Sequence, residues 1–109
     1  MATLSTNAAT SLKFQIIEVD ITPPQGIYSR NWGAAQFDVA SGVHKSVFLS
    51  CLVTQSDEGT LGVILAADLG WWKNNDDERN LRTSIIEACG LQEQQLLFCL
   101  SHTHAGPSI

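Results

Sequence analysis

Four stretches of the chain have the hydrophobic pattern of β-strands. Residues 14–21 alternate between apolar and polar side chains and run into the turn-forming segment 22–26, which holds two prolines and a glycine. Residues 47–54 and 61–67 flank a polar, glycine-containing connection, which predicts a β-hairpin. Residues 61–67 are apolar at successive positions, which is typical of a central strand covered on both faces.

A helix is predicted over residues 75–89. Asn75 followed by Glu78 fits an N-cap with a capping box, and the acidic first turn favours the positive end of the helix dipole. Gly90 has the position of a left-handed residue that ends a helix. The apolar positions of this segment form one stripe, expected to face a sheet: Leu81, Ile85, Ala88 and Cys89.

The last strand is predicted at residues 96–101, so strand, helix and strand follow one another from residue 61 onward. Such units have parallel strands whose carboxyl ends share one edge of the sheet. We therefore expect an α/β chain with a β-hairpin and a strand-helix-strand unit in a mixed sheet. Asp68 and Gly70 should then lie beside the residues that follow the last strand, where open α/β sheets bind ligands.

Composition narrows the class of protein. A chain of 109 residues with 44% hydrophobic residues forms at most one globular domain. A net charge of −5 argues against nucleic acid or an anionic membrane as partner, and no apolar run is long enough to span a bilayer. Residues 1–12 are expected to form a flexible tail. They lack the features of a signal peptide, so secretion is not indicated and the cytoplasm is the default expectation.

The three cysteines show no metal-binding spacing. Cys51 and Cys99 lie in strand-like runs and Cys89 lies at the end of the predicted helix, so we expect all three to be buried as small hydrophobic residues. Residues 27–40 have no clear period and are expected to form a loop, whose aromatic residues argue against disorder.

The candidate chemistry follows the last strand. His102 and His104 are two positions apart, so in an extended backbone their imidazoles lie on the same side and can chelate one Zn²⁺ ion. Asp68 is a candidate catalytic residue that orients a histidine through the ring N–H; the alternative is a turn that closes its strand. The alternative for the histidines is an ordinary polar loop.

Other candidates have more than one interpretation. His44 can approach the site or be a solvated loop residue, and Arg30 can bind an anionic group or be a surface residue. Asp20 is expected to form a turn. Three tryptophans can line an apolar substrate groove or belong to the core: Trp32, Trp71 and Trp72.

Four segments together resemble the N-terminal part of the neutral/alkaline (non-lysosomal) ceramidase family, in the family's order. The resemblance covers about residues 18–108. Its most specific part is Ser101-His102-Thr103-His104-Ala105-Gly106-Pro107, similar to the family's Thr-His-Thr-His-Ser-Gly-Pro signature. The other three are Val19-Asp20-Ile21-Thr22-Pro23-Pro24 with Gly26, Gly42-Val43-His44, and Ala67-Asp68-Leu69-Gly70.

The resemblance implies a zinc-dependent amidase that cleaves an N-acyl amide, with ceramide as the substrate of characterised members. It implies that His102 is a zinc ligand and that His104, a candidate catalytic residue, lies in the same site either behind the metal ligands or in contact with substrate. Family members are several times longer, and a further histidine, a glutamate and a tyrosine complete the ligand set from beyond the signature. Residues 13–109 are therefore expected to be the N-terminal portion of a catalytic domain, with the remainder of that domain as partner, and inactive alone.

Two departures from the family and two alternatives remain. Leu49 and Ser50 stand where the family has an alanine-arginine pair, and Trp71-Trp72 is a subgroup feature that bears on the acyl substrate. The alternatives to a zinc amidase are a non-catalytic, truncated relative that folds or binds a partner, and another metal-dependent hydrolase with a His-x-His strand end.

Overall fold

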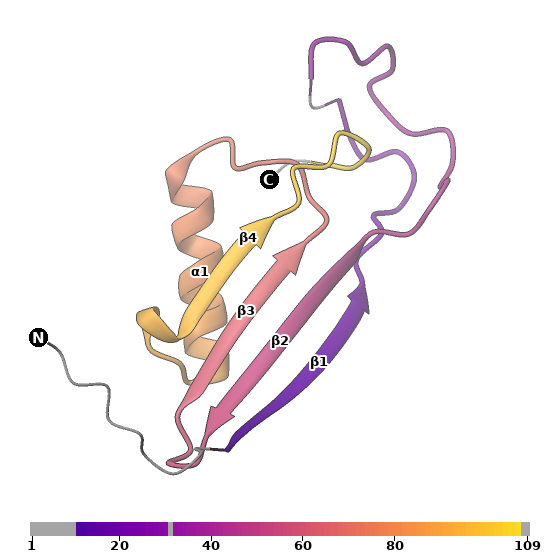
Figure 1. Cartoon of the computed structure of the whole chain (residues 1–109). Coiled ribbons are helices and arrows are strands. Elements are labelled where there is room, and N and C mark those ends of the chain that lie inside the picture. Colours follow the sequence, from indigo (N-terminus) through magenta and orange to yellow (C-terminus); the bar gives the residue numbers. More distant parts are fainter. Residues whose placement is uncertain (1–10, 31, 108–109) are drawn as a thin grey trace, which may run out of the picture.

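The structure is a computed structural model that describes residues 11–30 and 32–107. The elements are β1 (Leu12–Asp20), β2 (Phe48–Ser56), β3 (Leu61–Ala67), α1 (Asn75–Cys89), the short 3₁₀ helix η1 (Glu93–Gln95) and β4 (Leu96–Leu100). The four strands form one sheet in the order β1-β2-β3-β4, and the chain passes through α1 and η1 on its way from β3 to β4 (Figure 1).

The sheet is mixed, as predicted. β1 and β2 are antiparallel, β2 and β3 form the predicted hairpin, and β3 and β4 are parallel neighbours. Because Ala67 pairs with Leu100, the carboxyl ends of β3 and β4 lie together. The two chain segments stay side by side beyond the sheet: Thr103 N donates to Leu69 O (3.3 Å) and Gly70 N to Pro107 O (2.9 Å).

The first strand begins earlier than its pattern predicts. Ser11 N donates to Asp57 Oδ2 in the β2–β3 turn (3.0 Å), and Leu12 pairs with Ser56. The predicted flexible tail over residues 1–12 is therefore wrong for its last two residues. Residues 1–10 of that prediction lie outside the described residues. β4 ends at Leu100, one residue short of its predicted end.

Helix α1 has the predicted bounds but a different N-cap. Asn74, and not Asn75, has the extended backbone of a cap residue, and its Oδ1 accepts from Asp77 N (2.9 Å). The predicted capping box of Asn75 with Glu78 is wrong by one position, because both asparagines have an acidic residue three positions on. Gly90 has φ 63° and ends the helix as predicted.

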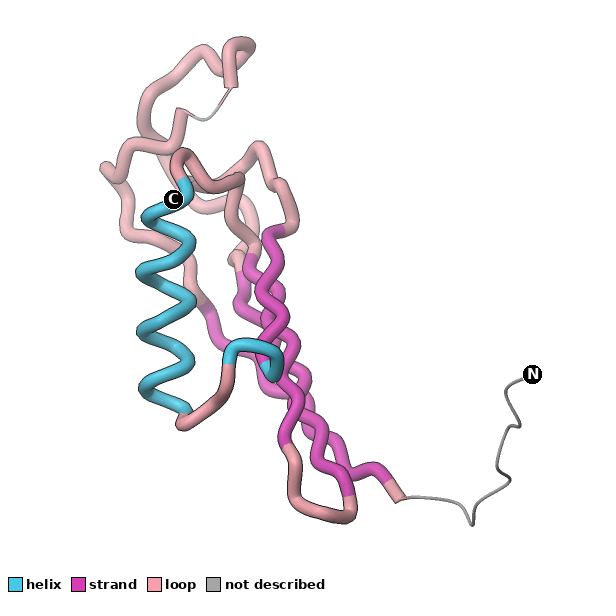
Figure 2. Tube along the Cα trace, turned by 90° about the vertical axis from the view of Figure 1, so that its left-hand side faces the viewer, coloured by secondary structure: helices cyan, strands magenta, loops and turns pink. Residues whose placement is uncertain are grey.

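The helix packs on one face of the sheet, over β3 and β4, whereas β1 is exposed along its whole length (Figure 2). Leu81 and Ile85 are half-buried there, as predicted, whereas Ala88 and Cys89 of the expected stripe are exposed. Arg82 extends this contact, since its Nε donates to Glu78 Oε1 (2.6 Å) and its Nη1 to Leu96 O (3.1 Å). No helix in the described part of the chain is both long and apolar enough to cross a membrane.

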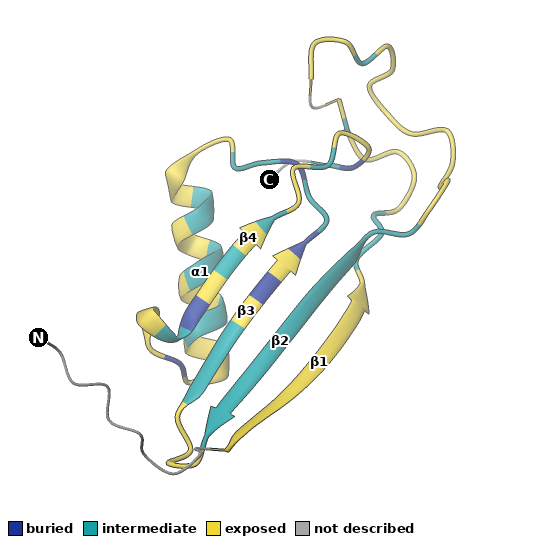
Figure 3. Cartoon of the chain, in the orientation of Figure 1, coloured by how far each residue is buried: buried dark blue, intermediate teal, exposed yellow. Residues whose placement is uncertain are grey.

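The opposite face of the sheet is open (Figure 3). The buried hydrophobic residues of the described ranges are Leu65, Ala67, Leu91 and Leu96. On β3, Leu65 is 7% exposed on the helix side and its neighbour Ile64 is 41% exposed on the other. The expectation that this strand is covered on both faces is wrong, because α1 covers one face and no other described element covers the opposite one.

The cysteines follow the same division. Cys99 lies on the open face and is exposed, and Cys89 is exposed in the last turn of α1. Cys51, on the helix side of β2, is half-buried. The expectation that all three are buried is therefore wrong.

Candidate functional site

The two histidines of the signature lie in the loop after β4. Because the strand ends at Leu100, neither is in extended strand structure, and His102 has φ 60°. Alternation along a strand, the expected reason for both imidazoles to lie on one side, is therefore wrong. The rings are nevertheless close, with centroids 5.2 Å apart and planes inclined by 44°.

His102 has a strained backbone. Among the described residues other than glycine, it alone has a positive φ, and this conformation costs on the order of 1–3 kcal/mol. Hydrogen bonds hold the loop on both sides of it: Ser101 N donates to Ala67 O (2.9 Å) and Thr103 N to Leu69 O (3.3 Å). The sheet edge therefore imposes the conformation that brings the two rings together.

The imidazole pair has the spacing of two ligands of one metal ion. Two imidazoles bound to a tetrahedral zinc at about 2.0–2.1 Å have ring centroids roughly 5 Å apart, and the observed separation is 5.2 Å. Within residues 11–30 and 32–107, no group of three or more His, Cys, Asp or Glu side chains is arranged to hold a metal ion. The described site thus supplies two nitrogen donors.

Two tryptophans contact the imidazole pair. Trp71 lies 5.0 Å from His102 and 5.9 Å from His104 between ring centroids, and Trp32 lies 5.0 Å from His104. Trp72 packs edge-on against Phe98 instead (5.6 Å). Sequence reasoning missed these contacts. The signal that could have found Trp71 is its position directly after Gly70, at the sheet edge where the histidine loop also begins.

The loop that carries Trp32 folds back on itself. Tyr28 forms an isolated bridge with Val39, Ser29 N donates to Asp38 O (2.8 Å), and Arg30 Nη1 lies 3.3 Å from Asp38 Oδ1. This arrangement gives the guanidinium of Arg30 a carboxylate partner on the surface. It also brings the tip of the 27–40 loop against His104.

Asp68 connects two strands. Its Oδ2 accepts from Phe48 N (3.0 Å), and its own backbone N donates to Phe48 O (2.9 Å). In the described part of the chain, no hydrogen bond joins this carboxylate to His102 or His104. Its observed contacts therefore fix the start of β2 to the end of β3, and its catalytic assignment stays a prediction.

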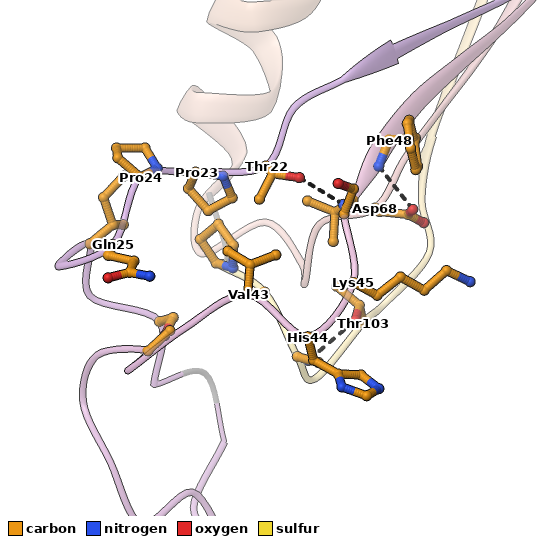
Figure 4. A pocket seen from close by; sticks show the side chains of 18 of the residues that line it. Thr22, Pro23, Pro24, Gln25, Val43, His44, Lys45, Phe48, Asp68 and Thr103 are labelled. Atoms are coloured by element: carbon orange, nitrogen blue, oxygen red, sulfur yellow. Dashed lines mark hydrogen bonds between the residues drawn. The ribbon is translucent and has the colours of Figure 1, made fainter.

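A cavity of about 750 Å³ lies on the same edge of the sheet (Figure 4). Its walls are formed by residues of segments 22–29, 40–48 and 101–107 together with Asp68, and neither His102 nor His104 is among the lining residues. Apolar side chains such as Pro23, Val43 and Phe48 line much of it, and Thr103, between the two histidines, lines it too. His44 is an exposed lining residue, and no described contact joins it to the imidazole pair.

The turn beside this cavity is held by Asp20, as predicted. Asp20 Oδ1 accepts from Thr22 N (2.8 Å), and Thr22 Oγ1 accepts from Val47 N (3.0 Å). Hydrogen bonds from Thr22 and Ser46 stabilise the charged carboxylate and hold the pKa of Asp20 below its usual value. These contacts join the ends of β1 and β2 at the cavity.

The resemblance to the ceramidase family rests on the sequence motifs alone. No known protein family matches the chain, and neither a curated protein nor a solved structure matches it.

Proposed function

We propose that this chain forms part of a zinc-dependent amidase of the ceramidase type, with His102 and His104 at the metal. The observation that carries the proposal is the pair of imidazoles 5.2 Å apart at the carboxyl edge of a parallel strand pair. The strained backbone of His102 supports it, because such strain is concentrated at functional sites.

The substrate class is an N-acyl amide with an apolar acyl group. The cavity beside Thr103 supports this choice, since its volume of about 750 Å³ falls within the range of roughly 300–1,000 Å³ of small-molecule sites. Apolar residues line much of it. Thr103, which also lines it, is the residue between His102 and His104 in the sequence. The acyl chain would lie in the cavity with its carbonyl directed at the histidines.

The reaction is hydrolysis of the amide bond. The oxygen of water adds to the acyl carbon, the C–N bond breaks, and both protons of the water pass to the nitrogen, which gives a carboxylate and an ammonium group. Zinc, when bound, would supply two things: a water nucleophile that ionises near pH 7, and polarisation of the acyl carbonyl by the metal ion. His102 would hold the metal, and His104 would hold it or contact the reacting group. Asp68 would fix the strand end that supports the loop.

The described residues supply two of the roughly three protein ligands that a catalytic zinc requires. We therefore propose that turnover needs the remainder of a catalytic domain as partner, and that the chain alone binds the metal without hydrolysis. A non-catalytic binding role is the second candidate, and the same ligand count favours it.

Calorimetric titration of the purified chain with Zn²⁺ tests the metal site. We expect weak binding that His102→Ala abolishes, because this change removes one of two donors. His104→Ala should weaken binding to a similar degree if both imidazoles chelate, or leave it intact if His104 contacts substrate only. His44→Ala is the matched control and should bind Zn²⁺ as the wild type does. Equal binding by the wild type and His102→Ala would refute the metal site.

Incubation with N-acylsphingosine and with a short N-acyl amide tests the role of the partner. We expect no amine release by the chain alone above a metal-free control. Release that is lost in His102→Ala would show that the residues of this chain suffice, and would overturn the requirement for a partner.

A further inference from the structure

Trp71 is placed to fix both imidazoles at once. Its ring lies 5.0 Å from that of His102, inclined by 30°, and 5.9 Å from that of His104, inclined by 74°. Trp32 contacts His104 as well, but its partner is that single ring and its side chain is 45% exposed. Trp71 therefore lies close to both imidazoles, tilted to that of His102 and nearly perpendicular to that of His104.

The residues on both sides of Trp71 are anchored, one to the histidine loop and one to β4. Gly70, the preceding residue, donates its N–H to Pro107 O (2.9 Å), which ties it to the far end of the histidine loop. Trp72, the following residue, packs against Phe98 of β4 (5.6 Å). Two fixed neighbours leave the Trp71 backbone little freedom. The indole and the imidazoles thus lie on two loops that leave the carboxyl ends of β3 and β4, and hydrogen bonds join these two loops.

We propose that Trp71 is a positioning residue that holds His102 and His104 at the separation and inclination required to share one metal ion. The inference rests on the proposed metal site and adds a residue that acts through the two ligands without touching the metal. Aromatic packing of this kind contributes beyond the area it buries and depends on ring geometry. An aliphatic side chain of similar bulk fills the space without supplying that geometry.

Three variants separate this role from simple packing, with Zn²⁺ as the probe in calorimetric titration. Trp71→Leu should lower the affinity by about 10-fold or more, as loss of groups that orient metal ligands does. Trp71→Phe should restore most of it, because it keeps an aromatic face. Trp72→Leu is the matched control, since it removes a neighbouring indole that packs on Phe98, and it should bind nearly as the wild type does.

Proton NMR of the imidazole rings gives a second readout that needs no metal. In the wild type, the ring current of Trp71 should displace the carbon-bound ring protons of both histidines, which are assigned from His102→Ala and His104→Ala. Trp71→Leu should move both sets of resonances toward their positions in an unfolded chain, whereas Trp72→Leu should not.

The outcomes are distinct from those of the proposed function. If Zn²⁺ binds the wild type and Trp71→Leu equally while His102→Ala fails to bind, the site stands and the role of Trp71 is overturned. If neither set of imidazole resonances moves in Trp71→Leu, the positioning contact is refuted without reference to metal. If the resonances move but no chain binds Zn²⁺, the metal site fails and Trp71 orders the loop alone, which overturns the proposal as stated.

Discussion

At the scale of residues, the observed contacts of Asp68 agree with the alternative in which it closes its strand. Its carboxylate accepts from Phe48 N and its own N–H donates to Phe48 O, so one residue closes the ladder between β2 and β3. Asp68→Ala leaves a half-buried amide without its acceptor, and we expect a loss of about 1–3 kcal/mol in the free energy of unfolding. Denaturant titration of the purified variant measures it.

Asp68→Asn is the control for this change. Its amide oxygen can still accept from Phe48 N, so it should retain most of the stability. If the carboxylate acts only through Phe48, Asp68→Asn should also bind Zn²⁺ with wild-type affinity. A large loss of affinity in a stable Asp68→Asn variant would instead restore the direct role beside a histidine.

The candidate site residues could be selected from the sequence, but their geometry could not be predicted from it. Spacing and position after an apolar strand were sufficient to select His102 and His104. The positive φ of His102 depends on backbone hydrogen bonds to Ala67 and Leu69, which are more than thirty residues away in the sequence. The contacts of Trp32 and Trp71 arise in the same way, from segments that meet only in the folded chain.

At the scale of elements, helix α1 offers a direct test of its start. Asn74 accepts from Asp77 N (2.9 Å) and is the N-cap, whereas Asn75 is the first residue of the helix. Asn74→Ala should lower the free energy of unfolding by about 1 kcal/mol, the usual effect of removing a cap. Asn75→Ala is the matched control and should be neutral or slightly stabilising, because alanine favours the helix.

Thermal and denaturant unfolding of the two variants, followed by circular dichroism, supplies the measurement. Equal stability of the two variants would contradict the assigned cap. The reverse order would support the capping box of Asn75 with Glu78 that the sequence pattern predicts.

The elements themselves follow from local pattern and chirality. The hairpin, the helix bounds and the parallel pairing of β3 with β4 were all predictable, because periodicity and the strand-helix-strand order are local properties. The place of β1 at the sheet edge was not, since it depends on pairing across 27 residues between Asp20 and Phe48. Its early start depends on Asp57, in a turn that no local pattern connects to Ser11.

At the scale of the whole molecule, α1 covers one face of the sheet over β3 and β4, and the opposite face is open. The register places Phe14, Leu52, Ile64 and Leu97 on the open side, and Phe14 is 71% and Leu97 58% exposed. The sequence predicted burial on both sides because the pattern of β3 reports which positions are apolar. It does not report what covers them.

Exposed apolar surface of this kind promotes association of soluble chains. We expect the purified chain to self-associate as its concentration rises, and Leu97→Ser to reduce that association because it places a polar group on the open face. Its effect on the free energy of unfolding should stay within about 0.5 kcal/mol, as for other exposed positions. Sedimentation velocity over a range of concentrations measures the first effect and denaturant titration the second.

Leu96→Ser is the matched control. It makes the same substitution at the adjacent residue, which faces the helix and is 5% exposed. Removal of this buried side chain should lower the free energy of unfolding by about 2–5 kcal/mol, since it leaves a cavity and places a hydroxyl among apolar neighbours. If Leu97→Ser is as destabilising as Leu96→Ser, then the open face is covered in solution, and the one-sided sheet does not describe the free chain.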